Sequence, residues 1–189
     1  MPQETPNPQN PRLESERLIL RKPEMKDAPH IQQLAGHEEV AKGTLTMPHP
    51  YEDGMAEEYI ARVADTPGTG GDYTFGIILK EIGTLIGNIG LRCNPTHKTA
   101  DLGYWVGVPY WGKGYVTEAA GEVLRFGFEA LDLNKIHASH FTDNPASGRV
   151  MQKIGMTHEG TQRQQYWRWE MFRDLALYGI LRSEYDAQK

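Results

Sequence analysis

The feature that most constrains this chain is a glycine-rich loop between a strand-like segment and a long helix-like segment. The strand is expected over residues 100–107, and the loop carries Gly112 and Gly114. Residues 116–131 follow, with apolar and small side chains at helical spacing. Glycine permits positive φ and lets the main chain approach a ligand closely. Because the first N–H groups of a helix are unpaired and lie at the positive end of its dipole, this junction predicts a pocket for a phosphate or diphosphate.

Several phosphate motifs compete for this loop on the residues alone. A Walker A motif matches Gly107, Gly112 and Lys113, but Gly114 stands where the motif needs a hydroxyl side chain for Mg²⁺. A dinucleotide-binding fingerprint matches Gly112 and Gly114, but its third glycine is replaced by Thr117 and only one strand–helix–strand unit is expected. The remaining readings are a coenzyme A loop and a glycine loop that only makes a tight turn.

The whole chain alternates strand-like and helix-like segments in the order β-α-α-β-β-β-α-β-α-β-β. Three central strands joined by short turns predict an antiparallel meander. The strand–helix–strand unit over residues 100–141 is expected to be parallel and right-handed. Asn144 and Pro145 suit the N-cap and first position of the last helix, which Gly155 closes. We therefore expect a mixed α/β sheet, with strands at 17–21, 73–80, 84–92, 100–107, 135–141, 156–161 and 174–181 and earlier helices at 28–35 and 55–63.

Length and composition narrow the class of protein. The 189 residues correspond to about one domain, which we place at residues 12–189, because the prolines of residues 1–11 predict a disordered tail. The net charge of −5 argues against nucleic acid as a partner. A single cysteine, Cys93, excludes an internal disulfide and a Cys-rich zinc site. Without a membrane-spanning apolar run or a secretory signal, we expect a cytoplasmic protein with no membrane partner.

Motifs around the glycine loop together resemble the GNAT superfamily of N-acetyltransferases. The acyl-CoA loop of that family has the pattern Q/R-x-x-G-x-G/A between a strand and a helix, and Trp-Gly-Lys-Gly-Tyr-Val at residues 111–116 stands in its place. Flanking segments are similar to the ribosomal-protein-alanine N-acetyltransferase (Rim) branch, and the resemblance covers residues 13–185. These segments are Gly103-Tyr-Trp-Val106, Thr117-Glu-Ala119, Asn144-x-x-Ser147, Lys153-x-Gly-Met156, Tyr166-Trp-Arg168 and Asp174-x-x-x-Tyr178.

Three positions depart from the family pattern. Trp111 and Val116 replace the first and last residues of the loop pattern, so contact with phosphates is left to backbone N–H groups. The tyrosine that many GNAT enzymes use as general acid falls at Met151, which has no proton to donate.

The resemblance implies a fold and a co-substrate. The fold is a GNAT-like, mostly antiparallel mixed sheet (α/β, or α+β in some schemes) with about seven strands, splayed central strands and about four helices. Acetyl-CoA would lie with its diphosphate in the loop and its pantetheine arm along a free strand edge, where an N–H near Trp105 or Val106 polarises the thioester carbonyl. No metal is implied. The cofactor-binding residues so implied are Tyr104, Trp105, Val106, Gly112, Lys113, Gly114, Tyr115, Val116, Thr117 and Asn144.

Each candidate catalytic residue has a competing structural role. By resemblance Ser147 would protonate the departing thiolate, but it is also a plausible solvated serine of a first helical turn. Asn144 would bond the pantetheine amide, cap its helix, or do both. Asp101 is the candidate general base beside the expected acceptor site, or a surface carboxylate at a strand edge. Glu118 complements a helix dipole, and we interpret it as structural.

The implied reaction is direct attack of a primary amine on the thioester. The acceptor is a protein N-terminus or a small amine such as a polyamine or an aminoglycoside. The alternative is a non-catalytic acyl-CoA-binding sensor on the same fold. The expected acceptor loops, residues 43–51 and 68–72, carry no readable specificity code. The aromatic group Tyr166, Trp167 and Trp169 is interpreted as a wall of the acceptor pocket, a homodimer face or ordinary packing.

Other chemistry-bearing residues do not combine into a site. His137 and His140 are three apart in an expected strand, so they point to opposite faces and form no metal pair. Cys93 lies near His97, but nothing supplies the third group that an activated thiol needs.

Overall fold

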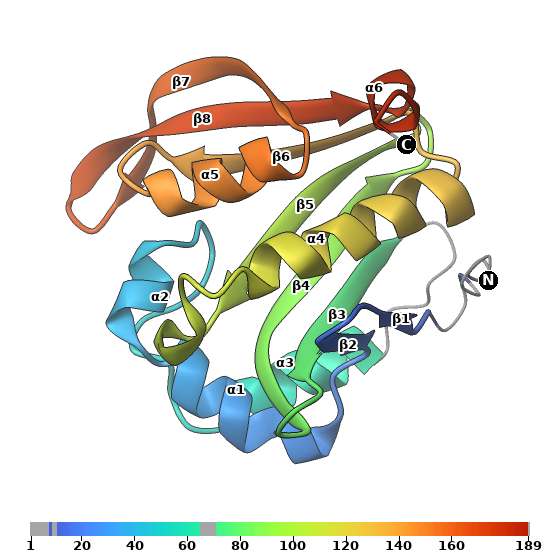
Figure 1. Ribbon diagram of the computed structural model, residues 1–189. Helices are drawn as coiled ribbons and strands as arrows, with labels where there is room; N and C mark the ends of the chain where they lie inside the picture. Colours follow the sequence, from blue (N-terminus) through green and yellow to red (C-terminus); the bar gives the residue numbers. More distant parts are fainter. Residues whose placement is uncertain (1–7, 9–10, 65–70, 189) are drawn as a thin grey trace.

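Three long strands form the centre of the sheet, because their apolar side chains meet helices on both faces. The computed structural model describes residues 8, 11–64 and 71–188. β3 (Asp72–Leu79), β4 (Thr84–Asn94) and β5 (Thr99–Val106) form the predicted antiparallel meander, and β2 (Leu18–Arg21) and β1 (Leu13–Glu14) extend it beyond β3 (Figure 1). The tail predicted for residues 1–11 lies mostly outside the described residues, as do residues 68–70 of the second predicted acceptor loop.

The second half of the sheet diverges from the first. β6 (Lys135–Phe141) is parallel to β5, as predicted, but the two strands pair only where Thr99–Asp101 meets Lys135–His137. Beyond Asp101, β5 is still paired with β4. β6 is paired along its whole length with β8 (Met171–Leu181), which in turn pairs with β7 (Thr157–Arg168). The strand order is β1-β2-β3-β4-β5-β6-β8-β7. The expected splay of the central strands is therefore present between β5 and β6.

Helices cover the two faces of the sheet. α1 (Ala28–Ala35) and α3 (Met55–Ala64) pack Ile31 and Ile60 onto Leu85 of β4. On the opposite face, α4 (Tyr115–Arg125) packs Val123 into the larger core, together with Phe75 of β3, and α5 (Pro145–Lys153) lies beside α4 (Figure 1). Shorter segments complete the chain: η1 (Met25–Asp27), α2 (Glu38–Lys42), η2 (Val108–Tyr110), the π-helical turn η3 (Phe126–Ala130) and α6 (Arg182–Asp186).

The structure corrects several predicted elements. Within the described residues the sheet has eight strands and there are six α-helices, rather than about seven and four. The helix expected over 116–131 ends as α4 at Arg125 and continues as η3. The strands expected at 156–161 and 174–181 are longer than predicted and form one hairpin. The prediction was too short for β7 because almost every residue of this strand is exposed, which leaves no alternating apolar pattern.

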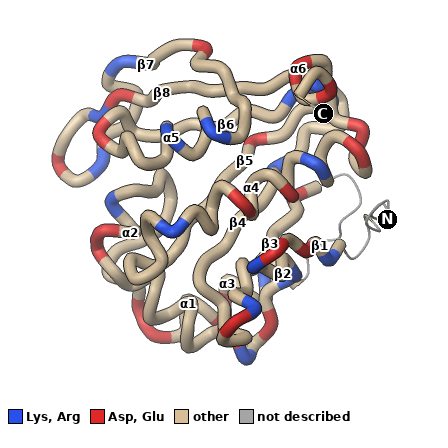
Figure 2. The backbone as a smooth tube through the Cα atoms, viewed as in Figure 1, with Lys and Arg blue, Asp and Glu red and all other residues tan. Residues whose placement is uncertain are grey.

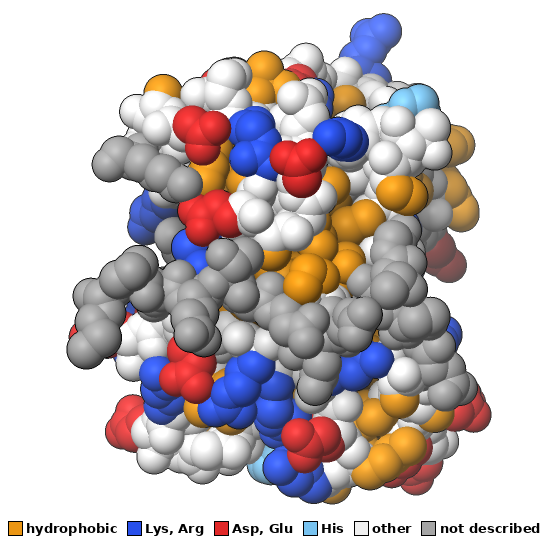
Figure 3. Space-filling model, turned by 90° about the vertical axis from the view of Figure 1, so that its right-hand side faces the viewer, with side chains coloured by type: hydrophobic (Ala, Val, Ile, Leu, Met, Phe, Trp, Pro, Cys, Tyr) orange, Lys and Arg blue, Asp and Glu red, His pale blue; other side chains and the backbone are white. Residues whose placement is uncertain are grey.

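Charged side chains of both signs are mixed over the surface. Lys and Arg lie interspersed with Asp and Glu, mainly outside the central strands (Figure 2). The face drawn in Figure 3 shows the same mixture around a stretch of hydrophobic side chains. Local ion pairs, rather than a field of one sign, therefore set the electrostatics of the sites described below.

Candidate active site

The glycine loop reaches α4 through two residues in the left-handed region. Gly112 has a φ of 72° and Gly114 a φ of 80°. A Cβ on Gly112 would meet no atom within 4 Å, so the backbone conformation, not crowding, requires glycine there. Gly114 is the N-cap of α4 and supplies no side-chain hydrogen bond to the first turn. The exposed loop thus presents main-chain N–H groups at the positive end of a helix, as predicted.

An ion pair braces this junction from the neighbouring strands. Glu118 of α4 accepts hydrogen bonds from Ser15 Oγ at 2.6 Å and from Arg17 N at 2.8 Å, and Arg17 Nε donates to its second oxygen at 2.6 Å. Arg17 also donates to the carbonyl of Lys113 and lies over the ring of Tyr115. Burial alone raises the pKa of Glu118, but these donors hold that pKa below its usual value. Glu118 therefore has the structural role that we inferred.

The divergence of the strands leaves one edge of β5 without a strand partner. Trp105 pairs with Asn88 of β4, and Val106 with Gly87, but within the described residues neither pairs with β6. The indole of Trp111 donates to the carbonyl of Val106 at 2.8 Å. Trp111, which departs from the family pattern, therefore fixes the loop against the end of β5. No local sequence pattern predicts this contact.

Ser147 joins a small hydrogen-bonded group at the start of α5. Its Oγ lies 2.8 Å from the hydroxyl of Tyr104, which also donates to the Ser147 carbonyl at 3.1 Å. Asn144 caps α5 as predicted, because its Oδ1 accepts from Ser147 N at 3.3 Å, and its Nδ2 donates to the carbonyl of Gly43. Each polar atom of the Asn144 amide thus has one partner, and its second N–H is left for a further hydrogen bond. Met151 is buried on the same helix.

Four ionisable side chains form a row across the sheet. Asp72, Arg92, Asp101 and His137 occupy neighbouring register positions on β3, β4, β5 and β6. Asp101 Oδ1 lies 3.5 Å from His137 Nδ1. His140, by contrast, is buried, in agreement with the prediction that the two histidines point to opposite faces. Sequence reasoning proposed Asp101 alone, because the register that brings the other three to it appears only in the folded sheet.

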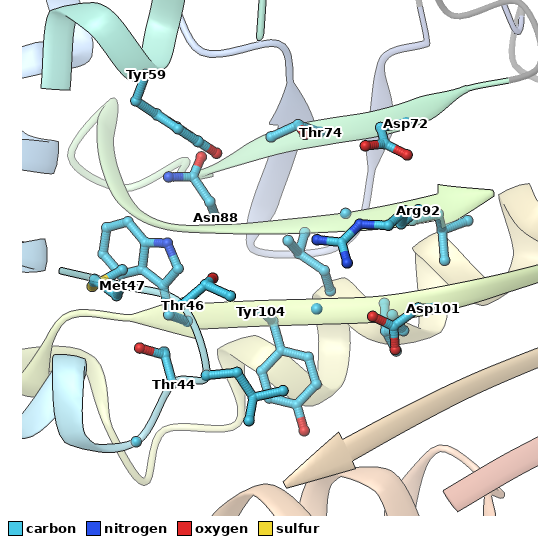
Figure 4. Close-up of a pocket in the computed structure, with 18 of the residues that line it drawn as sticks. Thr44, Thr46, Met47, Tyr59, Asp72, Thr74, Asn88, Arg92, Asp101 and Tyr104 are labelled. Carbon is cyan, nitrogen blue, oxygen red and sulfur yellow. The ribbon is translucent and has the colours of Figure 1, made fainter. Parts of the chain in front are cut away.

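A cavity of about 590 Å³ lies beside this row. Its walls come from β3, β4, β5 and the end of β6, from the segment 43–48, and from α1, α3 and the start of α5. Figure 4 shows part of this lining. Asp72, Arg92 and Asp101 lie at one end, whereas Tyr59 and Asn88 lie at the other (Figure 4).

The cavity gathers only some of the predicted site residues. Asp101, Tyr104, Trp105 and Ser147 all line it, whereas Val106, residues 112–117 and Asn144 do not. Sequence reasoning missed Asn88, Arg92 and Tyr59. A polar residue between apolar neighbours in a central strand was the available signal for Asn88.

Cys93 has the properties of a structural thiol. Burial, assisted by the charge of Asp72, raises its pKa to about 11, so the thiol stays protonated at neutral pH. This agrees with the sequence analysis, which found no third group to activate Cys93 as a nucleophile.

Together, the diverging strands, the uncapped glycine junction and the adjoining cavity define an N-acetyltransferase fold of the GNAT type. Residues 17–157 match the family model described as "Acetyltransferase (GNAT) domain", and the chain therefore belongs to the GNAT family of N-acetyltransferases. The resemblance drawn from the sequence motifs is thereby confirmed.

Relatives match over almost the whole chain. The "Uncharacterized N-acetyltransferase p20" of Bacillus licheniformis is 30% identical, covering 92% of this chain and 97% of its own. The "Putative ribosomal N-acetyltransferase YdaF" of Bacillus subtilis (strain 168) is 26% identical, covering 93% and 97%. Among the described helices, none has the length and hydropathy needed to cross a bilayer.

Solved structures show the same fold. A GNAT-family acetyltransferase from Bacillus anthracis superposes with a TM-score of 0.76 at 29% identity, covering 91% of this chain and 99% of that chain. A spermidine N-acetyltransferase from Vibrio cholerae, solved with CoA and spermine, gives a TM-score of 0.78 at 22% identity, covering 90% and 99%.

Proposed function

We propose that this protein transfers the acetyl group of acetyl-CoA to a primary amine, which attacks the thioester directly. The observation that carries the proposal is the divergence of β5 and β6 beside the glycine junction. The divergence leaves residues 104–106 without a described partner strand on the β6 side, although the Val106 carbonyl accepts from Trp111, and the helix N-terminus has no side-chain cap. A ligand with an anionic diphosphate and an amide-bearing arm complements both features.

The hydrogen-bond donors of the glycine junction are suited to a diphosphate. The N–H groups of Gly112, Lys113, Gly114, Tyr115, Val116 and Thr117 would hold it, and Lys113 adds a positive charge. Each hydrogen bond to a charged group contributes about 1.5–3 kcal/mol, so several together suffice without a metal. When bound, acetyl-CoA supplies an acetyl group activated as a thioester.

On the acceptor side, Asp101 would take the proton of the amine, directly or through water. Its Oδ1 lies 3.5 Å from Nδ1 of His137, its neighbour on β6. An α-amine has a pKa of about 8 and a lysine amine one of about 10.4, a difference of about 3.3 kcal/mol in the free energy of deprotonation. Because a carboxylate is a weak base, this arrangement favours a protein or peptide N-terminal α-amine over a lysine.

On the leaving-group side, Ser147 would donate a proton to the departing thiolate. The backbone N–H of Trp105 or Val106 would polarise the thioester carbonyl. Burial raises the pKa of Tyr104 to about 12, so its hydroxyl keeps its proton and can orient Ser147 through their hydrogen bond. This pair supplies a hydroxyl where the family tyrosine is replaced by Met151.

The names of the relatives include a putative ribosomal N-acetyltransferase and a spermidine N-acetyltransferase. Proteins and polyamines are both acceptors that carry primary amines. We therefore test the reaction by thiol release from acetyl-CoA over a panel of peptides, polyamines and aminoglycosides. Ser147→Ala and Asp101→Asn should each lower kcat with little change in acetyl-CoA affinity. Saturable acetyl-CoA binding without amine-dependent thiol release would instead indicate the acyl-CoA sensor. A cytoplasmic location and a homodimer stay predictions.

The glycine junction is tested by Gly114→Val against Gly83→Val. Gly83 also has a positive φ, 66°, and open space around it, so both changes introduce similar backbone strain. Because only Gly114 lies at the junction, we expect Gly114→Val to weaken acetyl-CoA binding at least tenfold and Gly83→Val to leave it within twofold. Quenching of tryptophan fluorescence by acetyl-CoA measures this. Equal affinities in the two variants would contradict the role of the junction.

A further inference from the structure

Asn88 is a buried amide whose hydrogen-bonding groups are unused within the protein. The residue is 3% exposed, and neither its Nδ2 nor its Oδ1 has a hydrogen-bond partner among the described residues. Its cross-strand neighbours are Gly76 of β3 and Trp105 of β5. Gly76 has no side chain that could bond the amide, and a Cβ there would clash with Leu85 Cδ1 at 2.8 Å. The side chain points into the cavity, toward Tyr59 of α3 (Figure 4).

Buried polar groups in native proteins are normally hydrogen-bonded, and a buried amide without a partner is costly. Asn88 therefore calls for a partner that enters the cavity. An asparagine amide presents two donors and an acceptor side by side. Its natural complement is another amide, which supplies a C=O and an N–H in the reverse order.

The surroundings of Asn88 are suited to a neutral group. Ile31, Met47, Tyr59 and Trp105 are uncharged and line the same end of the cavity. The exposed Glu58 and Arg62 of α3 also line the cavity, and Arg62 lies over the ring of Tyr59. The charged row lies at the other end. Arg92, its member on β4, is four residues from Asn88, which in a strand is about 13 Å. The cavity therefore has the charged row next to Asp101 at one end, and at the other end a buried amide with mostly uncharged side chains around it.

We propose that Asn88 recognises an amide group of the acceptor, so that the acceptor is a peptide or another carboxamide-bearing amine rather than a polyamine. This inference rests on the proposed acetyl transfer and narrows its substrate class. A peptide presents an amide at a fixed distance from its α-amine, whereas a polyamine presents only charged amines. A polyamine therefore carries no amide group that could satisfy Asn88.

The test compares Asn88→Leu with the wild type, using the tripeptide Ala-Ala-Ala and spermidine as acceptors. Leucine branches as asparagine does but forms no hydrogen bonds. Two lost hydrogen bonds predict a fall in kcat/KM for the tripeptide of about tenfold, mainly through KM. KM for acetyl-CoA and the rate with spermidine should change less than twofold. Asn134→Leu, an exposed asparagine before β6, is the matched control and should change neither.

Three results would overturn the inference: a preference of the wild type for spermidine, an unchanged tripeptide KM in Asn88→Leu, or a raised KM for acetyl-CoA in Asn88→Leu. Absence of thiol release with every amine tested would contradict the proposed reaction rather than this site. In that case calorimetric titration of Ala-Ala-Ala into the protein with CoA present decides the inference alone. Binding that is weakened about tenfold by Asn88→Leu supports it, and absence of binding to the wild type refutes it.

Discussion

Two polar residues of the cavity use their hydrogen-bonding groups in opposite ways. Ser147 is bonded to Tyr104 and to its own helix cap, so its position is fixed before any ligand arrives. Asn88 is equally enclosed by protein but keeps its donors and acceptor free within the described residues. A group that is already bonded can be held in place for catalysis, whereas an unbonded one is available for recognition.

At this scale, Asn88→Leu should make the unliganded protein more stable. The change removes a buried amide that lacks a partner, and such a group costs about 1–3 kcal/mol. We expect the free energy of unfolding to rise by about that amount in urea titrations, while tripeptide binding weakens. If the change destabilised the protein, Asn88 would have an internal partner and a structural role.

The residue scale is also where sequence reasoning was least complete. Asp101 was proposed from its place at the start of a strand, but its neighbour His137 lies 36 positions further on and meets it only through the parallel register of β5 and β6. The contact between Tyr104 and Ser147 likewise depends on how α5 packs. Such pairs are set by tertiary structure, and local pattern carries no information about them.

At the scale of elements, Glu118 joins the β1–β2 region to the N-terminus of α4. Because the folded-state pKa of Glu118 is lowered, its stabilising contribution is complete above the unfolded-state pKa and is lost as the pH falls through the folded-state pKa. Glu118→Gln should therefore lower the free energy of unfolding by about 1–3 kcal/mol at neutral pH and by much less in acid.

Urea unfolding at about pH 7 and about pH 3 measures this difference, bracketing the usual carboxyl pKa. Glu122→Gln serves as control on the same helix, since Glu122 makes only a local ion pair with Arg125, worth about 0.5 kcal/mol. A loss in Glu118→Gln that stayed constant or grew in acid would contradict the assignment.

The β7–β8 hairpin holds the segment that closes the cavity. Arg168 donates to the carbonyls of Ala41 and Met47, and Arg173 donates to the carbonyl of Lys42. Arg168→Ala should therefore speed hydrogen exchange in residues 43–48 and raise the acceptor KM several-fold, without weakening acetyl-CoA binding.

Arg163→Ala is the comparison for this hairpin, because Arg163 is exposed on β7 and makes no hydrogen bond or ion pair with the described residues. It should leave exchange and KM as in the wild type. Identical behaviour of the two variants would show that the hairpin does not position the segment.

The elements themselves were largely predictable where burial is one-sided. The meander, the parallel unit and the cap of α5 follow from apolar periodicity and from Asn144-Pro145. β1 was missed because two residues carry no period, and the outer part of β7 because exposed strands have no alternation. An apolar pattern arises only where one face of an element is buried, so an exposed element has no pattern to detect.

At the scale of the whole molecule, the sheet is two halves joined over three residue pairs. The larger core extends across both halves, from β1–β5 to β6 and β8, and the smaller core covers the other face of the first half. Beyond these pairs, β5 is paired only with β4 and β6 only with β8 among the described strands, so the facing edges of β5 and β6 stay open. The cavity and the glycine junction lie along the same strand, β5, which lets one strand position both substrates.

The most direct measurement is backbone hydrogen exchange of the full chain with and without saturating acetyl-CoA. If main-chain donors of the junction and of the open strand edge hold the co-substrate, amides within residues 104–106 and 112–117 will exchange at least tenfold more slowly in its presence. Unchanged exchange in both segments, under conditions where acetyl-CoA is shown to bind, would contradict the account.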